Sequence, residues 1–464
     1  MSELPPNWTR APLQILGHWG SGGTPKRTNP AYFAGGTIPW LVIGDLNGGV
    51  VTHASANITE AGLANSSAKL LPIDTLLIAM YGSIGKLGIT GVECATNQAI
   101  ASCAPDADVA SLRYLFYALM SEQKALIAQG QGGAQQNISQ GILKTHEIPL
   151  APINEQQRIT DKLEAVLARV DACRERLDRV PAILKRFRQT VLAAATSGKL
   201  TEGWRGSERD TPWMERLLVD LCDEGRLITY GVIKLGSDVL EGVPCLRTSN
   251  VRWLRIDTDG IKRIAPVLSS NYSRTILNGG EVLVNVRGTL GGVAVAQPEM
   301  AGWNVSREVA VVPIDTKRVN SFFLAYWIGS EESQRWLGGV KKGVAYVGIN
   351  IEDLRNLPIG VPSMEEQQEI VRRVESLFAY ADGLEARYQA ARAQVERLTP
   401  ALLAKAFRGE LVPQDPDDEP ASVLLERIRA ARAAVPAKPK RGRGAALRES
   451  SEDKVAPVVA GHRS

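Results

Sequence analysis

The chain has 464 residues, too many for one ordinary hydrophobic core, and this length predicts about two to four domains. Hydrophobic residues make up 44% and charged residues 22%, as in folded soluble proteins, and no apolar run reaches the ~18 residues that a bilayer span needs. The formal net charge of +4 permits an anionic partner without requiring one.

The cysteines and the N-terminal residues bear on the compartment. The five cysteines are odd in number and form no Cys-x-x-Cys pair, which disfavours a disulfide framework and a zinc finger. The first residues lack the basic and apolar segments of a secretion signal. We therefore expect free or buried thiols and a cytoplasmic protein.

Residues 1–152 are predicted to form a first globular domain. This region is rich in Gly, Val, Ile, Thr and Asn, and its short apolar runs, such as 40–43 and 76–80, are bounded by turn residues and predict strands. The Gly- and amide-rich run 130–137 is interpreted as a loop that enters a groove of a binding partner or, equally well, as a plain surface loop.

Residues 153–205 are predicted to contain a long helix. Apolar residues recur there in steps of four and three from Ile159 to Val191, the spacing of a coiled-coil seam. At 1.5 Å per residue the run spans ~48 Å. Pro181 lies inside it and predicts a kink or a break, and Gly198 predicts the helix end.

Residues 206–361 are predicted to form a second globular domain, with strands at 281–286 and 309–312. Two short stretches match the first domain: 243–246 resembles 38–41, and 287–291 resembles 81–85. Since the rest has diverged, we expect the two domains to perform two different recognition tasks.

Residues 362–412 repeat the first long helix at an offset of 211. Without gaps, 15 of the 46 positions from 155 to 200 are identical to their counterparts at 366 to 411, including Glu155-Gln156-Gln157. The same apolar spacing recurs, with Pro400 inside it and Gly409 at its end. We expect the two helices to pair antiparallel within one chain, with a domain at each end; the alternative is two amphipathic helices packed on separate cores.

The last residues differ in composition. Residues 413–435 predict an acidic linker and a short amphipathic helix at 421–434. Residues 436–464 are low in large apolar residues and carry a basic cluster, so they predict a disordered tail that binds nucleic acid or is merely solvated.

The motifs together resemble those of the specificity subunits of Type I restriction-modification systems, most closely the first (IA) subclass. The resemblance covers about residues 5–435 and is carried by Gly22-Gly23-Thr24-Pro25-Lys26-Arg27, Ile38-Pro39-Trp40-Leu41, Gly44-Asp45-Leu46, 148–157, 184–189, 357–368 and 403–411. The second domain departs from the pattern because it has no Gly-Gly-Thr-Pro run.

The resemblance implies an α+β protein: two α/β target-recognition domains separated by two conserved helices that form an antiparallel coiled coil. It implies a subunit without catalysis of its own that reads a split, asymmetric DNA site. It also implies two methyltransferase subunits, and nuclease/translocase subunits in the full complex, with S-adenosylmethionine, ATP and Mg²⁺ bound by those partners. If both domains use the major groove from one side, the half-sites should lie ~34 Å apart.

Several short strings mimic catalytic motifs without their context. Asn29-Pro30-Ala31-Tyr32 lacks the second proline of a methyltransferase loop. Asp106 and Glu122 suit a nuclease metal site poorly, because Glu122 follows a predicted helix. Gly82–Lys86 is too short for a phosphate-binding loop, and the four histidines are scattered. We therefore predict no catalytic residue and no metal site.

Basic, amide and hydroxyl side chains near the predicted turns are the candidate DNA contacts. They are Lys26, Arg27, Tyr81, Ser83, Lys86, Asn97, Gln98, Gln135, Gln136, Asn137, Arg247, Asn250, Arg252, Arg287, Thr289, Arg307, Lys341, Lys342 and Tyr346. The predicted seam consists of Ile159, Leu163, Val166, Val170, Leu177, Leu184, Phe187, Ile370, Val374, Leu377, Leu384, Tyr388, Val395 and Leu398. The alternative function is a non-catalytic coiled-coil adaptor whose domains bind a ligand other than DNA.

Overall fold

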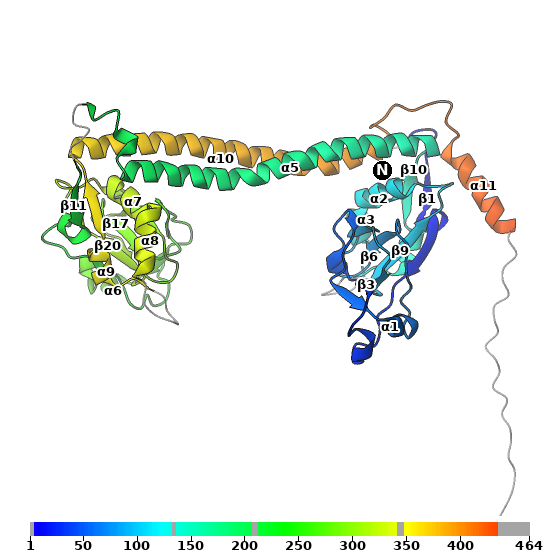
Figure 1. Ribbon diagram of the computed structural model, residues 1–464, viewed down its shortest axis with the longest axis horizontal. Helices are drawn as coiled ribbons and strands as arrows, with labels where there is room; N and C mark the ends of the chain where they lie inside the picture. The colour runs from blue at the N-terminus through cyan, green and yellow to red at the C-terminus, as the bar shows by residue number, and fades with distance from the viewer. Residues whose placement is uncertain (1–3, 132–135, 207–211, 341–347, 435–464) are drawn as a thin grey trace, which may run out of the picture. The chain divides into compact units, whose positions relative to one another are not determined.

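The computed structural model describes residues 4–131, 136–206, 212–340 and 348–434. The chain divides into two compact units (Figure 1). Unit 1 consists of residues 1–168 and 398–464, and unit 2 of residues 169–397. Both boundaries fall inside the long helices, so each unit contains a globular domain and a segment of each helix. None of the described helices combines the length and hydropathy that a membrane span requires.

The strands of unit 1 form three small, largely antiparallel sheets. The largest has the order β2-β9-β6-β7-β4, the second β5-β3-β8 and the third β1-β10. The strands are β1 (Thr9–Pro12), β2 (Gly17–Ser21), β3 (Ile38–Leu41), β4 (Val50–Val51), β5 (Ala56–Ile58), β6 (Leu76–Ala79), β7 (Leu87–Thr90), β8 (Ala95–Thr96), β9 (Ile100–Pro105) and β10 (Glu147–Leu150).

Unit 2 repeats this arrangement, except that within the described residues its main sheet has four strands and no counterpart of β4. Its sheets have the orders β12-β20-β17-β18, β16-β13-β19 and β11-β21, with an added hairpin β14-β15. The strands are β11 (Met214–Leu217), β12 (Thr229–Tyr230), β13 (Val243–Leu246), β14 (Val251–Arg252), β15 (Arg255–Ile256), β16 (Lys262–Ile264), β17 (Val282–Asn285), β18 (Val293–Val295), β19 (Asn304–Val305), β20 (Val309–Val312) and β21 (Pro358–Val361). The predicted strands at 76–80, 281–286 and 309–312 are thus confirmed, whereas the strand predicted at 40–43 begins and ends two residues earlier, as β3.

Short helices cover the sheets and close the two main cores. In unit 1 the buried ring of Tyr114 lies 5.4 Å from that of Phe407, which links α2 to the residue that follows the second long helix. In unit 2, α7 is buried almost throughout against β17 and β18. The short helices are α1 (Glu60–Ala64), α2 (Leu112–Ser121), α3 (Gln123–Ala128), α4 (Gln140–Thr145), α6 (Pro266–Ser270), α7 (Ser321–Gly329), α8 (Glu331–Gly339) and α9 (Ile351–Arg355).

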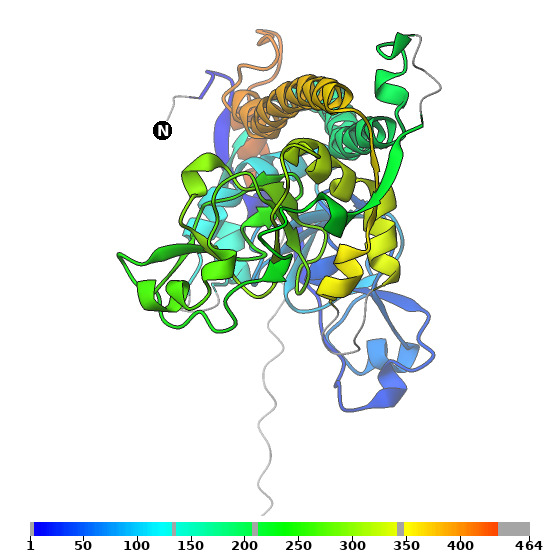
Figure 2. The same ribbon diagram turned by 90° about the vertical axis from the view of Figure 1, so that its left-hand side faces the viewer.

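The two long helices, α5 (Ile153–Thr196) and α10 (Met364–Ala406), pack side by side (Figures 1 and 2). Within unit 2, Arg188 of α5 pairs with Asp382 and Glu385 of α10 at 2.6 and 2.7 Å, and Asp178 pairs with Arg392. Along these ion pairs the residue numbers in α10 rise as those in α5 fall, so the two helices are antiparallel. The predicted intramolecular pairing is therefore confirmed.

The helix ends also pack on the domain cores, so the alternative interpretation describes part of the structure. Ile159 and Leu163 belong to the core of unit 1, and Ile370 and Val374 to that of unit 2. Of the other predicted seam residues, Val170 and Leu184 are buried, whereas Val166, Leu177, Phe187, Leu377, Leu384, Tyr388 and Val395 are half-buried.

Leu398, which we predicted for the seam, is 38% exposed and does not lie in it. The adjacent stripe, which includes Leu403 and Ala406, is buried in the unit 1 core instead. A straight α-helix drifts by ~20° per heptad relative to a 3.5-residue repeat. The face that meets the domain is therefore displaced from the face that the heptad spacing selects.

The prolines and glycines of the helices behave differently from one another. Both helices continue through Pro181 and Pro400, so the predicted break is absent. Gly198 and Gly409 have φ of 74° and 76°, in the left-handed region that glycine tolerates. At Gly409 the backbone N–H groups of Glu410 and Gly409 donate to the carbonyls of Lys405 and Ala406, which closes the helix in a Schellman motif.

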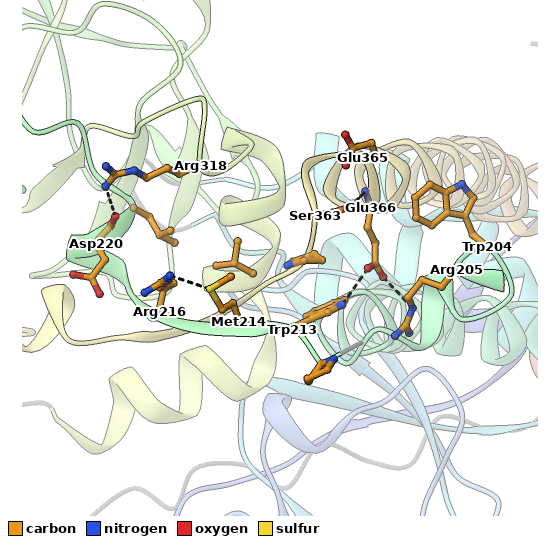
Figure 3. A pocket seen from close by; sticks show the side chains of 14 residues that line it. Trp204, Arg205, Trp213, Met214, Arg216, Asp220, Arg318, Ser363, Glu365 and Glu366 are labelled. Atoms are coloured by element: carbon orange, nitrogen blue, oxygen red, sulfur yellow. Dashed lines mark hydrogen bonds and ion pairs between the residues drawn. The ribbon is translucent and has the colours of Figure 1, made fainter. Parts of the chain in front are cut away.

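The repeated Glu-Gln-Gln sequence fastens each domain to the start of its helix. Glu155 accepts a hydrogen bond from the indole of Trp8 at 2.9 Å, and Glu366 accepts one from Trp213 at 3.2 Å. Arg205 also approaches Glu366, as Figure 3 shows, with N–O separation of 3.2 Å. The next residue, Gln156 or Gln367, is buried and bonds three backbone groups of its own unit.

The segment after α10 closes on the start of α5 within unit 1. Gln414 donates to Glu155 at 2.6 Å, and Asp418 pairs with Arg158 at 2.5 Å. The predicted C-terminal helix is confirmed as α11 (Ala421–Ala434), and its Leu425 is buried in the unit 1 core. The predicted tail at 436–464 lies outside the described residues.

Candidate DNA interface

In unit 2, polar side chains gather around the turn that joins β17 to β18. Buried Asn285 donates to the backbone carbonyls of Val251 and Thr289, both at 3.0 Å, and so ties this turn to the neighbouring turn at 247–251. The predicted contacts Arg287 and Thr289 are exposed on the turn. Side chains held on rigid turns beyond strand ends can reach a ligand without exposing strand backbone.

A third turn lies beside them. The backbone N–H of Val286 donates to the carbonyl of Glu308 at 2.9 Å, which places the 306–308 turn next to Arg287. The predicted contact Arg307 is exposed there and pairs with Glu308 at 3.3 Å. Residues 287, 289 and 307 therefore come together on one surface of unit 2.

The other predicted contacts of unit 2 differ in availability. Arg252 is exposed on β14, whereas half-buried Arg247 donates to the carbonyl of Gly260 at 2.9 Å. Asn250 is 1% exposed, and it accepts from the N–H of Arg247 and donates to the carbonyl of Asp257. Because these bonds hold Asn250 inside the turn, we do not include it among the DNA contacts. Lys341, Lys342 and Tyr346 lie outside the described residues.

In unit 1 the corresponding turn carries Tyr81 and Ser83, both exposed. Tyr81 forms an antiparallel bridge with Asn137, and the N–H of Gly82 donates to the carbonyl of Gln136 at 3.4 Å. The structure thus brings Gln136 and Asn137 to the predicted turn. Gln135 lies outside the described residues.

The remaining contacts of unit 1 lie on adjoining turns. The exposed side chain of Gln98 forms a hydrogen bond with Thr24, which precedes the exposed Lys26 and Arg27 in the sequence. Asn97 caps its own turn by accepting from the N–H of Ala99. Lys86 donates to the carbonyls of Ile43 and Gly44, both at 3.2 Å, so its ammonium group has a structural task in the described structure.

The second domain has no Gly-Gly-Thr-Pro sequence, but the structure shows that Gly231 occupies the position of Gly22 in the first domain. Gly22 passes the carbonyl of Thr96 so closely that a Cβ would collide with it, and Gly231 passes Val305 in the same way. Gly231 follows Tyr230, an exposed residue at the end of β12 that sequence reasoning missed. An ungapped comparison cannot align the two, because 16 positions separate residues 22 and 38 but only 12 separate 231 and 243.

Unit 2 also contains a cavity of about 1080 Å³, which lies where α10 begins and away from the turns that carry the candidate DNA contacts (Figure 3). Trp204, Met214 and Arg216 are among the side chains that line it, and none of the predicted DNA contacts does. The candidate interface is thus a set of exposed turns on each unit. One scaffold that occurs twice, with different side chains on matching turns, defines a protein with two dissimilar recognition domains.

Comparison with known proteins identifies the family. Residues 5–182 and 241–391 match the family model of the Type I restriction modification DNA specificity domain. The chain is 33% identical to the Type I restriction enzyme EcoBI specificity subunit of Escherichia coli, over 86% of this chain and 86% of that protein. It is 30% identical to the EcoKI specificity subunit of Escherichia coli strain K12, over 93% and 97%. The chain belongs to the family of Type I restriction-modification specificity subunits.

Solved structures show the same fold. A chain from a study of complex assembly and conformational transition in the type I R-M system matches with a TM-score of 0.69 and 21% identity, covering 88% of this chain and 100% of that one. The HsdS subunit from Thermoanaerobacter tengcongensis matches with a TM-score of 0.56 and 21% identity, covering 88% and 98%. The expected α+β fold with two recognition domains and paired helices is confirmed.

Proposed function

We propose that this chain reads an asymmetric, bipartite DNA sequence, one half-site with each globular domain, and directs partner subunits to it. The observation that carries the proposal is the repeated scaffold with unlike turns: Tyr81 and Ser83 in unit 1 occupy the positions of Arg287 and Thr289 in unit 2. Matched scaffolds support a common mode of docking, and unlike side chains support different half-sites.

The paired helices would set the distance between the half-sites. Antiparallel helices joined by ion pairs and packed on each domain core resist bending more than a flexible linker does. A fixed distance between two readers selects a fixed number of unspecified base pairs between two specified blocks.

The chemistry would lie on partner subunits. We assign no catalytic step to this chain. The partners would be two methyltransferase subunits with S-adenosylmethionine and, in the full complex, nuclease/translocase subunits with ATP and Mg²⁺. Such a complex would act on DNA in the cytoplasm. The adaptor alternative finds no support in the relatives, which are DNA specificity subunits.

Selection from random DNA tests the proposal. The full-length chain, co-expressed with the methyltransferase of its own system, is incubated with a random duplex library, and bound DNA is sequenced. We expect two conserved blocks separated by a constant gap, and two methyltransferase chains for each copy of this chain. A single uninterrupted block, or no enrichment, would contradict the proposal. Affinity should fall steeply with salt, because phosphate contacts release counterions.

A further inference from the structure

Tyr230 and Arg287 form a cation–π pair on the exposed surface of unit 2. The guanidinium carbon of Arg287 lies 5.7 Å from the centroid of the Tyr230 ring, within the ~6 Å range of a cation–π contact. The Tyr230 side chain is 41% exposed, and Arg287 is also exposed. The pair is therefore within reach of a ligand outside the domain.

The backbone on both sides of the pair is fixed. Arg287 forms an antiparallel bridge with Gly348, and its turn is tied down by buried Asn285. Tyr230 is paired with Ala310 in the sheet, and the next residue, Gly231, passes closely over Val305. Neither residue can move far without breaking the sheet.

Arg287 is not neutralised as its neighbours are. Among the described residues no carboxylate lies within ion-pair distance of it, whereas Arg307 pairs with Glu308. A guanidinium in contact with an aromatic face can still donate from the N–H groups at the edge of its own plane. Those edge donors are the groups that grip O6 and N7 of guanine in the major groove.

We propose that Tyr230 is a positioning residue for sequence reading: its ring restrains Arg287 so that the guanidinium meets a guanine edge-on in the second half-site. This inference rests on the proposed DNA-reading function. The cation–π contact restricts the side chain of Arg287 before DNA binds, so less conformational freedom remains to be lost in the complex.

The pair also distinguishes the two half-sites. In unit 1, Ser21 and Tyr81 occupy the positions of Tyr230 and Arg287, because Ser21 pairs with Ala101 as Tyr230 pairs with Ala310. Unit 1 has an aromatic ring on the turn and no arginine there. The restrained arginine is therefore a feature of the second domain, and its loss should leave the first half-site unchanged.

The test uses variants of the full-length chain, each purified together with its partner subunits. Each variant is compared with the wild type for binding to the DNA sequence that the wild type selects. Binding is measured on a panel with each base of both half-sites substituted, at two salt concentrations. Arg287→Ala should reduce discrimination at one position of the second half-site by about 5- to 150-fold. Tyr230→Leu should reduce it at the same position by about 2- to 5-fold, and Tyr230→Phe should retain it.

The double variant and two controls separate the possible outcomes. If Tyr230 acts through Arg287, Tyr230→Leu should add nothing to Arg287→Ala at that position. Arg216→Ala removes an exposed arginine from β11 and should change no base preference. A uniform loss across all sequences, with a smaller salt slope, would overturn the inference in favour of a phosphate contact. An unchanged profile for Tyr230→Leu would also overturn it, whereas a wild-type complex without sequence preference would refute the proposed function itself.

Discussion

Single buried residues explain why the helix repeat is recognisable in the sequence. The Glu-Gln pairs at 155–156 and 366–367 have the same tasks in both copies: the glutamate accepts a hydrogen bond from a tryptophan indole, and the glutamine bonds backbone groups at the base of the domain. The repeat was found in the sequence, but Trp8 and Trp213 were not paired in advance. They lie 205 positions apart instead of 211, so an ungapped comparison separates them.

Gln156 offers a test with a matched neighbour. Gln156→Ala should lower the free energy of unfolding of unit 1 by about 1–3 kcal/mol, because buried backbone groups of Ser111, Val109 and Ala151 would lose their partner. The change in unfolding free energy is measured by denaturant titration, with the hydrogen exchange of peptides from unit 1 as the readout. Gln157→Ala is the control: the Gln157 side chain is exposed and donates to Asp161, one turn further along the same helix, so a loss of equal size there would contradict the assignment.

Asp418 predicts a pH dependence for unit 1. The hydrogen bond from Arg158 holds the pKa of Asp418 below its usual value, so the folded state favours the charged carboxylate. That contribution is present above the unfolded pKa of about 4 and is lost as pH falls through the lower folded value. Asp418→Asn should destabilise unit 1 by about 1–2 kcal/mol at pH 7, since Arg158 is partly exposed.

Urea denaturation of both proteins between pH 7 and pH 3 checks this prediction. The difference between wild type and Asp418→Asn should be constant near neutrality and should shrink below about pH 4. If the difference in unfolding free energy between the two proteins does not change with pH, then side-chain packing, and not the charge of Asp418, stabilises the C-terminal segment on unit 1.

The helices and strands could be predicted from the periodicity of apolar residues, whereas the effects of single prolines and amides could not. The long helices, the short C-terminal helix and four strands follow from apolar spacing and turn residues, because those patterns report burial directly. Of the kink or break predicted at Pro181, the break does not occur: one lost backbone bond is outweighed by a helix anchored on cores at both ends. The role of Asn250 was also missed, because a sequence does not show whether an amide faces solvent or its own turn.

The helix register can be tested by exchanging charges. Asp178→Arg or Arg392→Asp alone places like charges opposite each other and should lower the free energy of unfolding, whereas the double exchange should recover most of that loss. The unfolding free energies of the four proteins give the coupling. Exchanging Glu175 and Arg179, which pair within α5, is the control and should show only the small effect of a local pair. A coupling of zero between residues 178 and 392 would contradict the antiparallel register.

In the proposed function the two domains recognise the DNA sequence, and the paired helices set the distance between the half-sites. Inserting one heptad into α5 and a matching heptad into α10 adds about 10 Å of helix, or about three base pairs of DNA. The half-sites selected by the variant should be unchanged, and the gap between them should lengthen. The selection experiment on the variant complex measures both. An active variant with the original gap would show that the helices do not set the spacing.

In the proposed function, this chain alone decides which DNA sequence its complex recognises, and that sequence is bipartite and asymmetric. Single-molecule sequencing of host DNA, with and without the gene for this chain, tests it most directly by locating methylated adenines. We expect a methylated motif of two unlike blocks around a constant unspecified gap, present only when the chain is expressed. An uninterrupted or palindromic motif, or a motif that persists without this chain, would contradict the account.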